Sequence, residues 1–358
     1  MTKTEKSFRE FMDSALYDPV HGYYTSSRNP ISEGGDYVTA PMISDVFSFA
    51  LTRLVREFET SLDHIPSSIV DVGCGDGRLI RSIAADLARD DGDTLFFGVD
   101  RGLARTESIG RGPVEFVSDL SQLPVDRPAL ILCNELYDSF PFARLVQRGD
   151  RLSELWVQEQ DDTPGWIERP APMAYGEYFE SHGIRLEPGQ FADVSLEWSE
   201  FHRRLCTRFE KGLVVVFDYG FEAEKLFDPR IRRFGTAASY SGHQVHRDLL
   251  RRPGGQDLTA HVNFSDLMRM GDSVGWQQLA FSRQAEFLLK LGITEHPDLA
   301  PVDTIDPPGE IEKALAVRER REAARRLILP DGIGQEIAVL VQTKGLPLEG
   351  WSFQRSLW

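Results

Sequence analysis

The stretch Ile69-Val70-Asp71-Val72-Gly73-Cys74-Gly75-Asp76-Gly77 indicates the fold, because an apolar strand runs directly into three glycines at alternate positions. Residues 78–89 follow with apolar side chains on one face of a predicted helix. A strand, a glycine turn and a helix let a backbone approach a nucleotide-like ligand closely. The G-x-G-x-G spacing and the missing Lys-Ser/Thr pair disfavour a dinucleotide site and a P-loop.

A second predicted strand, residues 93–100, indicates an adenosine as the ligand of this turn. It ends in Asp100, 23 positions after Gly77, where a carboxylate can accept hydrogen bonds from both ribose hydroxyls. A glycine turn with a late acid suits an adenosine that carries little or no phosphate. S-adenosylmethionine fits, because its charge is a sulfonium and an amino acid, whose ammonium group could meet Asp71. The alternative is a tight turn without any ligand.

Length and composition indicate a globular α/β protein. The 358 residues suffice for one large domain with insertions or for two smaller ones, and no apolar run reaches the length of a membrane span. Residues 1–18 carry acids and lack an apolar core, which argues against a secretory signal and a transit peptide, so we expect a cytoplasmic location. The net charge of −16 disfavours nucleic acid as the main partner and most simply serves solubility.

The cysteines and histidines give little support for a metal site. Cys74, Cys133 and Cys206 are odd in number and widely spaced, as in a protein of a reducing compartment. His243, His246 and His261 could form a metal triad, but they lack cysteine or carboxylate ligands at tight spacing. We therefore expect no metal.

The N-terminal region predicts a helical arm. Residues 7–17 form an amphipathic pattern, and a second helix is expected from Ser44 to Phe58. Between them, residues 34–41 are rich in glycine and aromatics and could cover a bound ligand. The alternative is a purely structural arm.

The remaining strands predict a doubly wound parallel sheet. Further strands are expected at 114–118, 129–133 and 213–217, with two late strands at 275–281 and 336–342 that can pair antiparallel. Residues 142–159 predict a hairpin, whereas 160–190 and 221–260 look irregular. Helices are expected at 193–210, 263–270, 284–291 and 310–327.

Polar residues follow two of the buried strands. Asn134, Glu135 and Asp138 come after strand 129–133, and Asp218 follows strand 213–217. Their strands end at the same sheet edge as the glycine turn, where ligands bind in open α/β sheets. Acids that merely stabilise a helix N-terminus are the competing explanation.

Several motifs in succession resemble one family. They are His21-Gly22-Tyr23-Tyr24, the segment Gly35-Asp36-Tyr37 with Thr39-Ala40-Pro41, Asn134-Glu135-Leu136 with Asp138 and Pro141, Asp218-Tyr219-Gly220, and Pro253-Gly254 with Asp257-Leu258-Thr259-Ala260-His261. Together, over residues 7–343, the chain resembles the MidA family, formerly DUF185, of class I S-adenosylmethionine-dependent methyltransferases. The resemblance implies a Rossmann-like methyltransferase domain at 61–348, with excursions at about 160–190 and 221–275, behind an arm at 1–60.

The resemblance also implies a donor site and a kind of acceptor. Gly73, Gly75 and Gly77 would cradle S-adenosylmethionine, Asp100 would hold the ribose and Asp119 would lie near the adenine. Gly35, Asp36 and Thr39 of the cover loop belong to the same predicted donor site. Asn134 and Glu135 would face the methyl group. A mitochondrial complex I assembly member of the family implies a protein arginine as acceptor, in a subunit of a respiratory NADH dehydrogenase.

For catalysis we expect Glu135 and Asp138 to bind the N–H groups of the acceptor, with Asn134 accepting a hydrogen bond. Asp218 and His261 are expected to support them or to carry a proton. Two positions depart from the family: Met42 and Asn263 stand where acids are usual. These departures leave open an assembly factor that binds the donor without turnover. A small-molecule methyltransferase is a third possibility, and an NAD-dependent oxidoreductase is disfavoured by the glycine spacing.

Overall fold

The chain folds into two compact units whose segments alternate along the sequence. The computed structural model describes residues 4–25, 45–63, 65–87, 93–102, 112–160, 163–242, 244–299 and 311–356. The first unit comprises Met1–Tyr37, Leu136–Arg203 and Tyr219–Met270, and the second comprises Val38–Glu135, Arg204–Asp218 and Gly271–Trp358. This division differs from an arm at 1–60 and a domain at 61–348, because residues 1–37 group with the predicted hairpin and the two predicted excursions.

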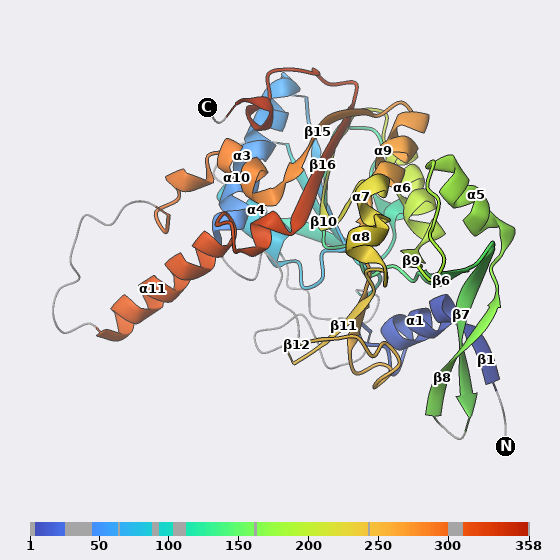
Figure 1. The fold of residues 1–358 in the computed structure, drawn as a ribbon. Helices are drawn as coiled ribbons and strands as arrows, with labels where there is room; N and C mark the ends of the chain where they lie inside the picture. Colours follow the sequence, from blue (N-terminus) through green and yellow to red (C-terminus); the bar gives the residue numbers. More distant parts are fainter. Residues whose placement is uncertain are drawn as a thin grey trace. The chain divides into compact units, whose positions relative to one another are not determined.

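The second unit contains the predicted sheet, in the order β15-β16-β10-β5-β2-β3-β4 (Figure 1). Its strands are β2 (Ser68–Val72), β3 (Leu95–Val99), β4 (Val114–Val117), β5 (Ala129–Asn134), β10 (Gly212–Phe221), β15 (Gln277–Arg283) and β16 (Ile337–Lys344). The pairs β2–β3, β3–β4, β2–β5 and β5–β10 are parallel, and β15–β16 is antiparallel. The doubly wound α/β sheet with an antiparallel final pair is therefore confirmed.

The second unit also contains the helices α3 (Asp45–Ser61), α4 (Arg78–Leu87), α10 (Gln284–Lys290) and α11 (Ile311–Arg326), with short 3₁₀ turns at Leu120–Gln122, Ile293–Glu295, Ile333–Gln335 and Ser352–Gln354. Helices α3 and α4 bury the apolar faces that the sequence pattern predicts. On α4, Leu79, Ile80 and Ile83 are buried, and each such side chain contributes about 1.5–3 kcal/mol by leaving water. All five residues of β2 are buried as well, so the glycine turn is anchored at both ends.

The first unit is built on a sheet in the order β1-β7-β6-β9, with β8 also paired to β7. Its elements are β1 (Thr4–Ser7), α1 (Phe8–Tyr17), β6 (Ala143–Arg148), β7 (Arg151–Gln160), β8 (Thr163–Pro170), α5 (Met173–Ser181) and β9 (Phe191–Val194). The hairpin prediction at 142–159 is confirmed by the β6–β7 pairing. The irregular structure expected at 160–190 is wrong, since β8 and α5 lie there. The prolines and glycine of β8 hide a strand that is defined by pairing with β7.

The second excursion also has more structure than its composition suggests. It holds α7 (Ala223–Leu226), α8 (Pro229–Arg232), β11 (Ala238–Ser241), β12 (Gln244–His246), β13 (Asp257–Thr259) and β14 (Val262–Asn263). Three of these strands form a small sheet in the order β12-β11-β13, and β14 pairs with the last residues of β10. Two helices cross the boundaries between the units, α6 (Leu196–Arg208) and α9 (Phe264–Ser273). The helix expected from Asp193 begins later, because Phe191–Val194 is a strand.

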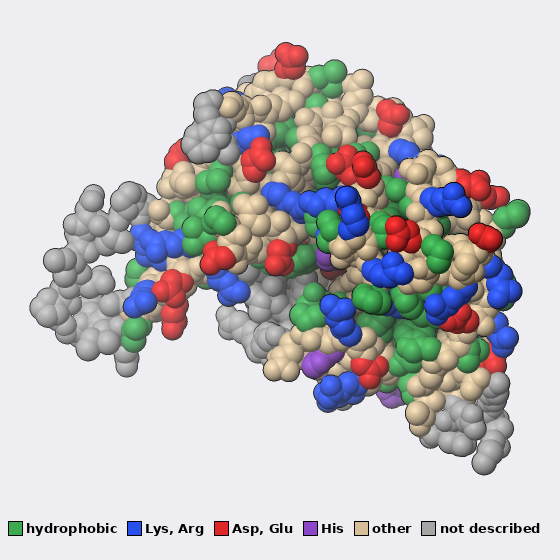
Figure 2. All heavy atoms as spheres, viewed as in Figure 1, with side chains coloured by type: hydrophobic (Ala, Val, Ile, Leu, Met, Phe, Trp, Pro, Cys, Tyr) green, Lys and Arg blue, Asp and Glu red, His purple; other side chains and the backbone are tan. Residues whose placement is uncertain are grey.

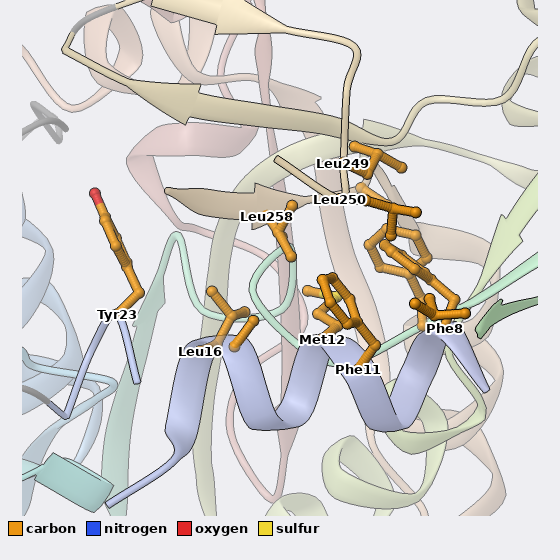
Figure 3. Close-up of a cluster of buried hydrophobic side chains, with 12 residues drawn as sticks. Phe8, Phe11, Met12, Leu16, Tyr23, Leu249, Leu250 and Leu258 are labelled. Atoms are coloured by element: carbon orange, nitrogen blue, oxygen red, sulfur yellow. The ribbon is translucent and has the colours of Figure 1, made fainter. Parts of the chain in front are cut away.

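An apolar cluster ties the N-terminal helix to the rest of the first unit (Figure 3). Phe8, Phe11, Met12 and Leu16 of α1 point toward Leu258 and the neighbouring leucines of the second excursion. Ser7 caps the helix: its hydroxyl accepts a hydrogen bond from the Glu10 amide, and the Glu10 carboxylate accepts one from the Ser7 amide. This packing holds the His21-Gly22-Tyr23-Tyr24 motif, which follows α1 directly, against residues 249–260.

Candidate active site

The glycine turn after β2 adopts the left-handed backbone that its glycines permit. Gly73, Gly75 and Gly77 have φ angles of 76°, 55° and 74°, a region that side chains with a Cβ rarely enter. At Gly77 a Cβ atom would lie 2.4 Å from the Phe116 ring. The amide of Gly73 donates to the carbonyl of Val99 over 2.8 Å. The turn is thus fixed against the end of β3, and its backbone can approach a ligand closely.

Asp100 lies at the end of β3 and braces the same turn. One of its carboxylate oxygens accepts a hydrogen bond from the amide of Gly75 at 3.0 Å, and the other accepts one from Gly102 at 2.8 Å. Burial raises the pKa of Asp100, while these two amides act in the opposite direction. Each carboxylate oxygen can accept a second hydrogen bond, so Asp100 can still receive the two hydroxyls of a ribose.

Asp71 is the second acid beside the glycine turn, and its situation is different. Its side chain is 2% exposed, and within the described part of the chain no group donates a hydrogen bond to its carboxyl group. Burial raises the pKa of Asp71 to about 7, with further contributions from the Asp100 and Asp76 carboxylates. An acid held in this way is poised to pair with a cation.

Asn134 is the last residue of β5, which neighbours β2 in the sheet, and Glu135 follows it directly. From β2 the chain continues to β3 and β4, whereas from β5 it continues to β10 on the other side, so these two strands flank the switch point where ligands bind. The Asn134 Oδ1 atom is buried and has no hydrogen-bond partner in the described residues. Glu135 has a φ of 49°, which is strained for a residue with a side chain, and its amide donates to Phe217 at 2.8 Å.

The other predicted residues of the second unit lie at the same edge. Asp218 follows Phe217 on β10 and is fully buried. Asp119 follows β4 and caps the short turn Leu120–Gln122, accepting a hydrogen bond from the Ser121 amide at 2.8 Å. The hydrogen bonds from Ser121 lower the pKa of Asp119. Capping explains this acid without a ligand, so its place near the adenine stays a prediction.

Asp138 and His261 belong to the first unit. Asp138 is 4% exposed, and its carbonyl accepts a hydrogen bond from the Ala260 amide. Close by, the Tyr24 hydroxyl donates to Asp257 at 2.8 Å. Burial raises the pKa of Tyr24, and the Asp257 and Asp138 charges add to this. The His261 ring packs on Phe221 at 5.7 Å between ring centroids. The motifs around residues 24, 138 and 257 therefore converge within this unit.

Asn263 has a structural explanation. It is fully buried, its amide nitrogen donates to the Tyr178 hydroxyl at 2.7 Å, and its oxygen caps α9 by accepting from the Ser265 amide. The Tyr178 hydroxyl donates to Asp266, which His182 contacts at 2.7 Å. Asn263 therefore takes part in a buried hydrogen-bond network. Its acid is Asp266, three residues later, which the sequence interpretation did not single out.

Five positions of interest lie outside the described residues. They are Gly35, Asp36, Thr39, Met42 and His243. The donor contacts predicted for the cover loop and the effect of Met42 therefore stay predictions.

A buried amide at the same sheet edge gave no signal in the sequence. Gln284 begins α10 directly after β15, and both amide atoms of its side chain are buried without a hydrogen-bond partner in the described part of the chain. The Thr343 hydroxyl, near the end of β16, donates to the carbonyl of Gly212 at the start of β10. Strand β16 is therefore antiparallel to β10. Strand β15, which is antiparallel to β16, ends at the sheet edge that carries the glycine turn. The sequence pattern showed only a helix start here.

The described residues offer neither a metal site nor a membrane-spanning helix. Among the described residues, no three His, Cys, Asp or Glu side chains are grouped so as to hold a metal, and no helix could span a membrane. Cys74, Cys133 and Cys206 are buried and free, and burial raises the pKa of the Cys206 thiol to about 12. Acidic and basic side chains are interspersed on the face that Figure 2 shows, which fits a role of the net charge in solubility.

Comparisons with known proteins agree with this geometry. Residues 100–282 match the profile of a family described as S-adenosyl-L-methionine-dependent methyltransferases. The mitochondrial protein arginine methyltransferase NDUFAF7 of Danio rerio is 26% identical, over 80% of this chain and 73% of its own, and the Bos taurus protein is 23% identical, over 83% and 72%. A Burkholderia thailandensis protein crystallised with S-adenosyl-homocysteine has a TM-score of 0.82 and 25% identity, covering 98% of this chain and 90% of its own.

Proposed function

Because this chain belongs to the MidA family of S-adenosylmethionine-dependent methyltransferases, we propose that it methylates a nitrogen of a protein side chain, with arginine as the acceptor. The methyl donor is S-adenosylmethionine. Relatives that are named protein arginine methyltransferases match most of this chain, which supports the acceptor. By the family resemblance, the acceptor protein is a subunit of a respiratory NADH dehydrogenase. We further propose that the reaction takes place in the cytoplasm.

The described residues fit the donor. Gly73, Gly75 and Gly77 offer a close backbone approach, and Asp100 keeps accepting capacity for the ribose hydroxyls. Asp71 presents a buried carboxyl group that lacks a donor, as the ammonium group of the amino acid requires. When bound, S-adenosylmethionine supplies a methyl group that its sulfonium already activates.

The acceptor nitrogen must then be oriented and relieved of a proton. Asn134 Oδ1 is the group that carries this proposal, because it is a buried acceptor without a donor at the switch point of the sheet. It would take an N–H of the guanidinium, while Glu135 would hold the positive charge with its carboxylate. The new N–C bond forms as the S–C bond breaks, and the proton lost by the nitrogen passes through Glu135 to water.

The test is to label a cell lysate with tritiated S-adenosylmethionine, with and without the protein. We expect label in one protein, which yields methylated arginine after acid hydrolysis and is a subunit of the dehydrogenase. Glu135→Gln should lower the labelling at least tenfold while S-adenosylhomocysteine binds with unchanged affinity. A lysate without labelled protein, or label on another residue type, contradicts the proposed acceptor. Cell fractionation tests the location.

The structure weakens the support for the alternative function, an assembly factor that binds the donor without turnover. Part of its support was the loss of an acid at position 263, but Asn263 is fully engaged in the network with Tyr178 and the α9 amide. The substitution therefore removes no exposed carboxylate. The remaining support is Met42.

A further inference from the structure

The two acids beside the glycine turn differ in what surrounds their carboxyl groups. Asp100 receives the amides of Gly75 and Gly102. Asp71, on the neighbouring strand, is 2% exposed and receives no hydrogen bond from any described residue. A buried carboxylate without a donor or a cation is costly, and the usual response of such a group is to keep its proton.

Among the described residues, the elements packed around Asp71 bring no positive charge to it. In the parallel register, Gly98 of β3 and Leu132 of β5 lie opposite this residue. The charged groups that act on it are the carboxylates of Asp100 and Asp76, both of which favour the protonated form.

The nearby arginines of α4 are engaged elsewhere. Arg78 contacts the Asp76 carboxylate at 3.4 Å, and the Arg81 guanidinium lies 4.7 Å from the centre of the Phe116 ring. Neither is among the charges that act on Asp71. In agreement with this environment, the pKa of Asp71 is raised to about 7, chiefly by burial.

We propose that Asp71 holds a proton in the donor-free enzyme and that the ammonium group of the donor displaces it, so that donor binding releases one proton to water. The inference rests on the proposed function, since it concerns the same donor site. In this step the O–H bond of the Asp71 carboxyl group breaks, its proton goes to solvent, and the ammonium group keeps its protons and pairs with the carboxylate. The enzyme would therefore take up its donor less readily as the surroundings become acidic.

The size of the effect follows from the ionised fraction. At pH 6, about one unit below the pKa of Asp71, roughly one molecule in ten carries the carboxylate that the ammonium group needs. The apparent dissociation constant rises in inverse proportion to the competent fraction. We expect S-adenosylhomocysteine, which carries the same amino acid, to bind about tenfold more weakly at pH 6 than at pH 8.

Titration calorimetry with S-adenosylhomocysteine tests the proton release directly. The heat is measured at pH 6 and pH 8 in two buffers of different ionisation enthalpy, since protons taken up by the buffer make the heat depend on the buffer. We expect close to one proton released per donor site at pH 6 and close to none at pH 8. Methylthioadenosine keeps the adenosine and the thioether but lacks the amino acid, so its binding to the same enzyme should release no proton.

Two variants separate Asp71 from other acids of the turn. Asp71→Asn should abolish the proton release and flatten the pH dependence, whereas Asp76→Asn, a matched change in the same turn, should keep both. If S-adenosylhomocysteine binds without proton release at pH 6, the inference is wrong and the proposed function stands. If it does not bind at all, both are wrong. Should Asp71→Asn fail to fold, the comparison with methylthioadenosine on the wild-type enzyme decides.

Discussion

Two buried polar clusters differ in how far their hydrogen bonds are satisfied. One is the proposed donor edge of the second unit, with Asp71 and Asn134, and the other is the Asn263 network of the first unit, with Tyr178, His182, Asn263 and Asp266. At the donor edge, the Asp71 carboxyl group and Asn134 Oδ1 have no partners among the described residues. In the network, Asn263 donates a hydrogen bond to the Tyr178 hydroxyl, and the Asp266 carboxylate has hydrogen bonds with both Tyr178 and His182. A protein tolerates unpaired buried groups mainly where a ligand will satisfy them. The first cluster is thus suited to binding and the second to holding the fold.

The largest expected effect is on the network. Asp266→Ala would leave the Tyr178 hydroxyl and the His182 ring without their shared acceptor, so we expect the free energy of unfolding to fall by about 4–5 kcal/mol. Urea denaturation measures this change. Asp272→Ala, at an exposed acid of the same helix, is the control and should change stability by less than about 0.5 kcal/mol. A tenfold loss of S-adenosylhomocysteine affinity in folded Asp266→Ala would show that this network also serves the donor.

The next effect is at the donor edge, where a substitution is expected to raise the stability of the protein and not to lower it. The pKa of Asp71 is about 7 in the folded chain against an ordinary value of 3.8 for an aspartate, so the folded state holds the proton more tightly. The proton on Asp71 therefore contributes fully to the free energy of unfolding below about pH 4, and this contribution is lost as the pH rises through 7. Asp71→Asn removes this dependence, and the variant should be more stable than the wild type at pH 8 by about 2–4 kcal/mol.

Urea denaturation without ligand, from pH 4 to pH 8, measures that difference. The two proteins should have similar stability at pH 4 and diverge toward pH 8. A variant that is less stable than the wild type at pH 8 would show that Asp71 is bonded in the folded state, and the contrast between the two clusters would disappear.

The smallest expected effect concerns the backbone at Glu135. Its φ of 49° costs about 1 kcal/mol for a residue with a Cβ, so Glu135→Gly should stabilise the protein by up to about that amount. Glu135→Gln keeps the strain and should leave stability unchanged, although both variants should lose turnover. Thermal denaturation and labelling of the acceptor compare them. Equal stability of the two variants would mean that the strain at this position is negligible.

The geometry of the proposed donor site could be predicted because its signals are local. Three alternate glycines after an apolar strand, and an acid at the end of the next strand, place Gly73 and Asp100 at one sheet edge. The apolar run 129–133 likewise predicts a central strand, which brings Asn134 to the same edge. The helix expected at 263–270 is confirmed for the same reason, and the Asn263 cap at its start involves only neighbouring residues.

The rest depends on contacts between distant segments. Strand β8 is defined by eight residues of pairing with β7, which its own proline-containing sequence does not reveal. Strand β1 pairs with residues about 150 positions later, and no window of sequence contains both partners. The role of Asn263 escaped for a similar reason, because Tyr178 and His182 lie far from it in the chain. Side-chain networks of this kind leave no periodic pattern to read.

The strand order also has a consequence for synthesis. Strand β16 (Ile337–Lys344) lies between β10 and β15, so the apolar edge of β10 stays uncovered until residues 337–344 have left the ribosome. An open, apolar strand edge invites pairing with other chains. A chain that stops before β16 would therefore contain the glycine turn and Asp100 but only an incomplete sheet. We expect chaperones and proteases to bind such a chain.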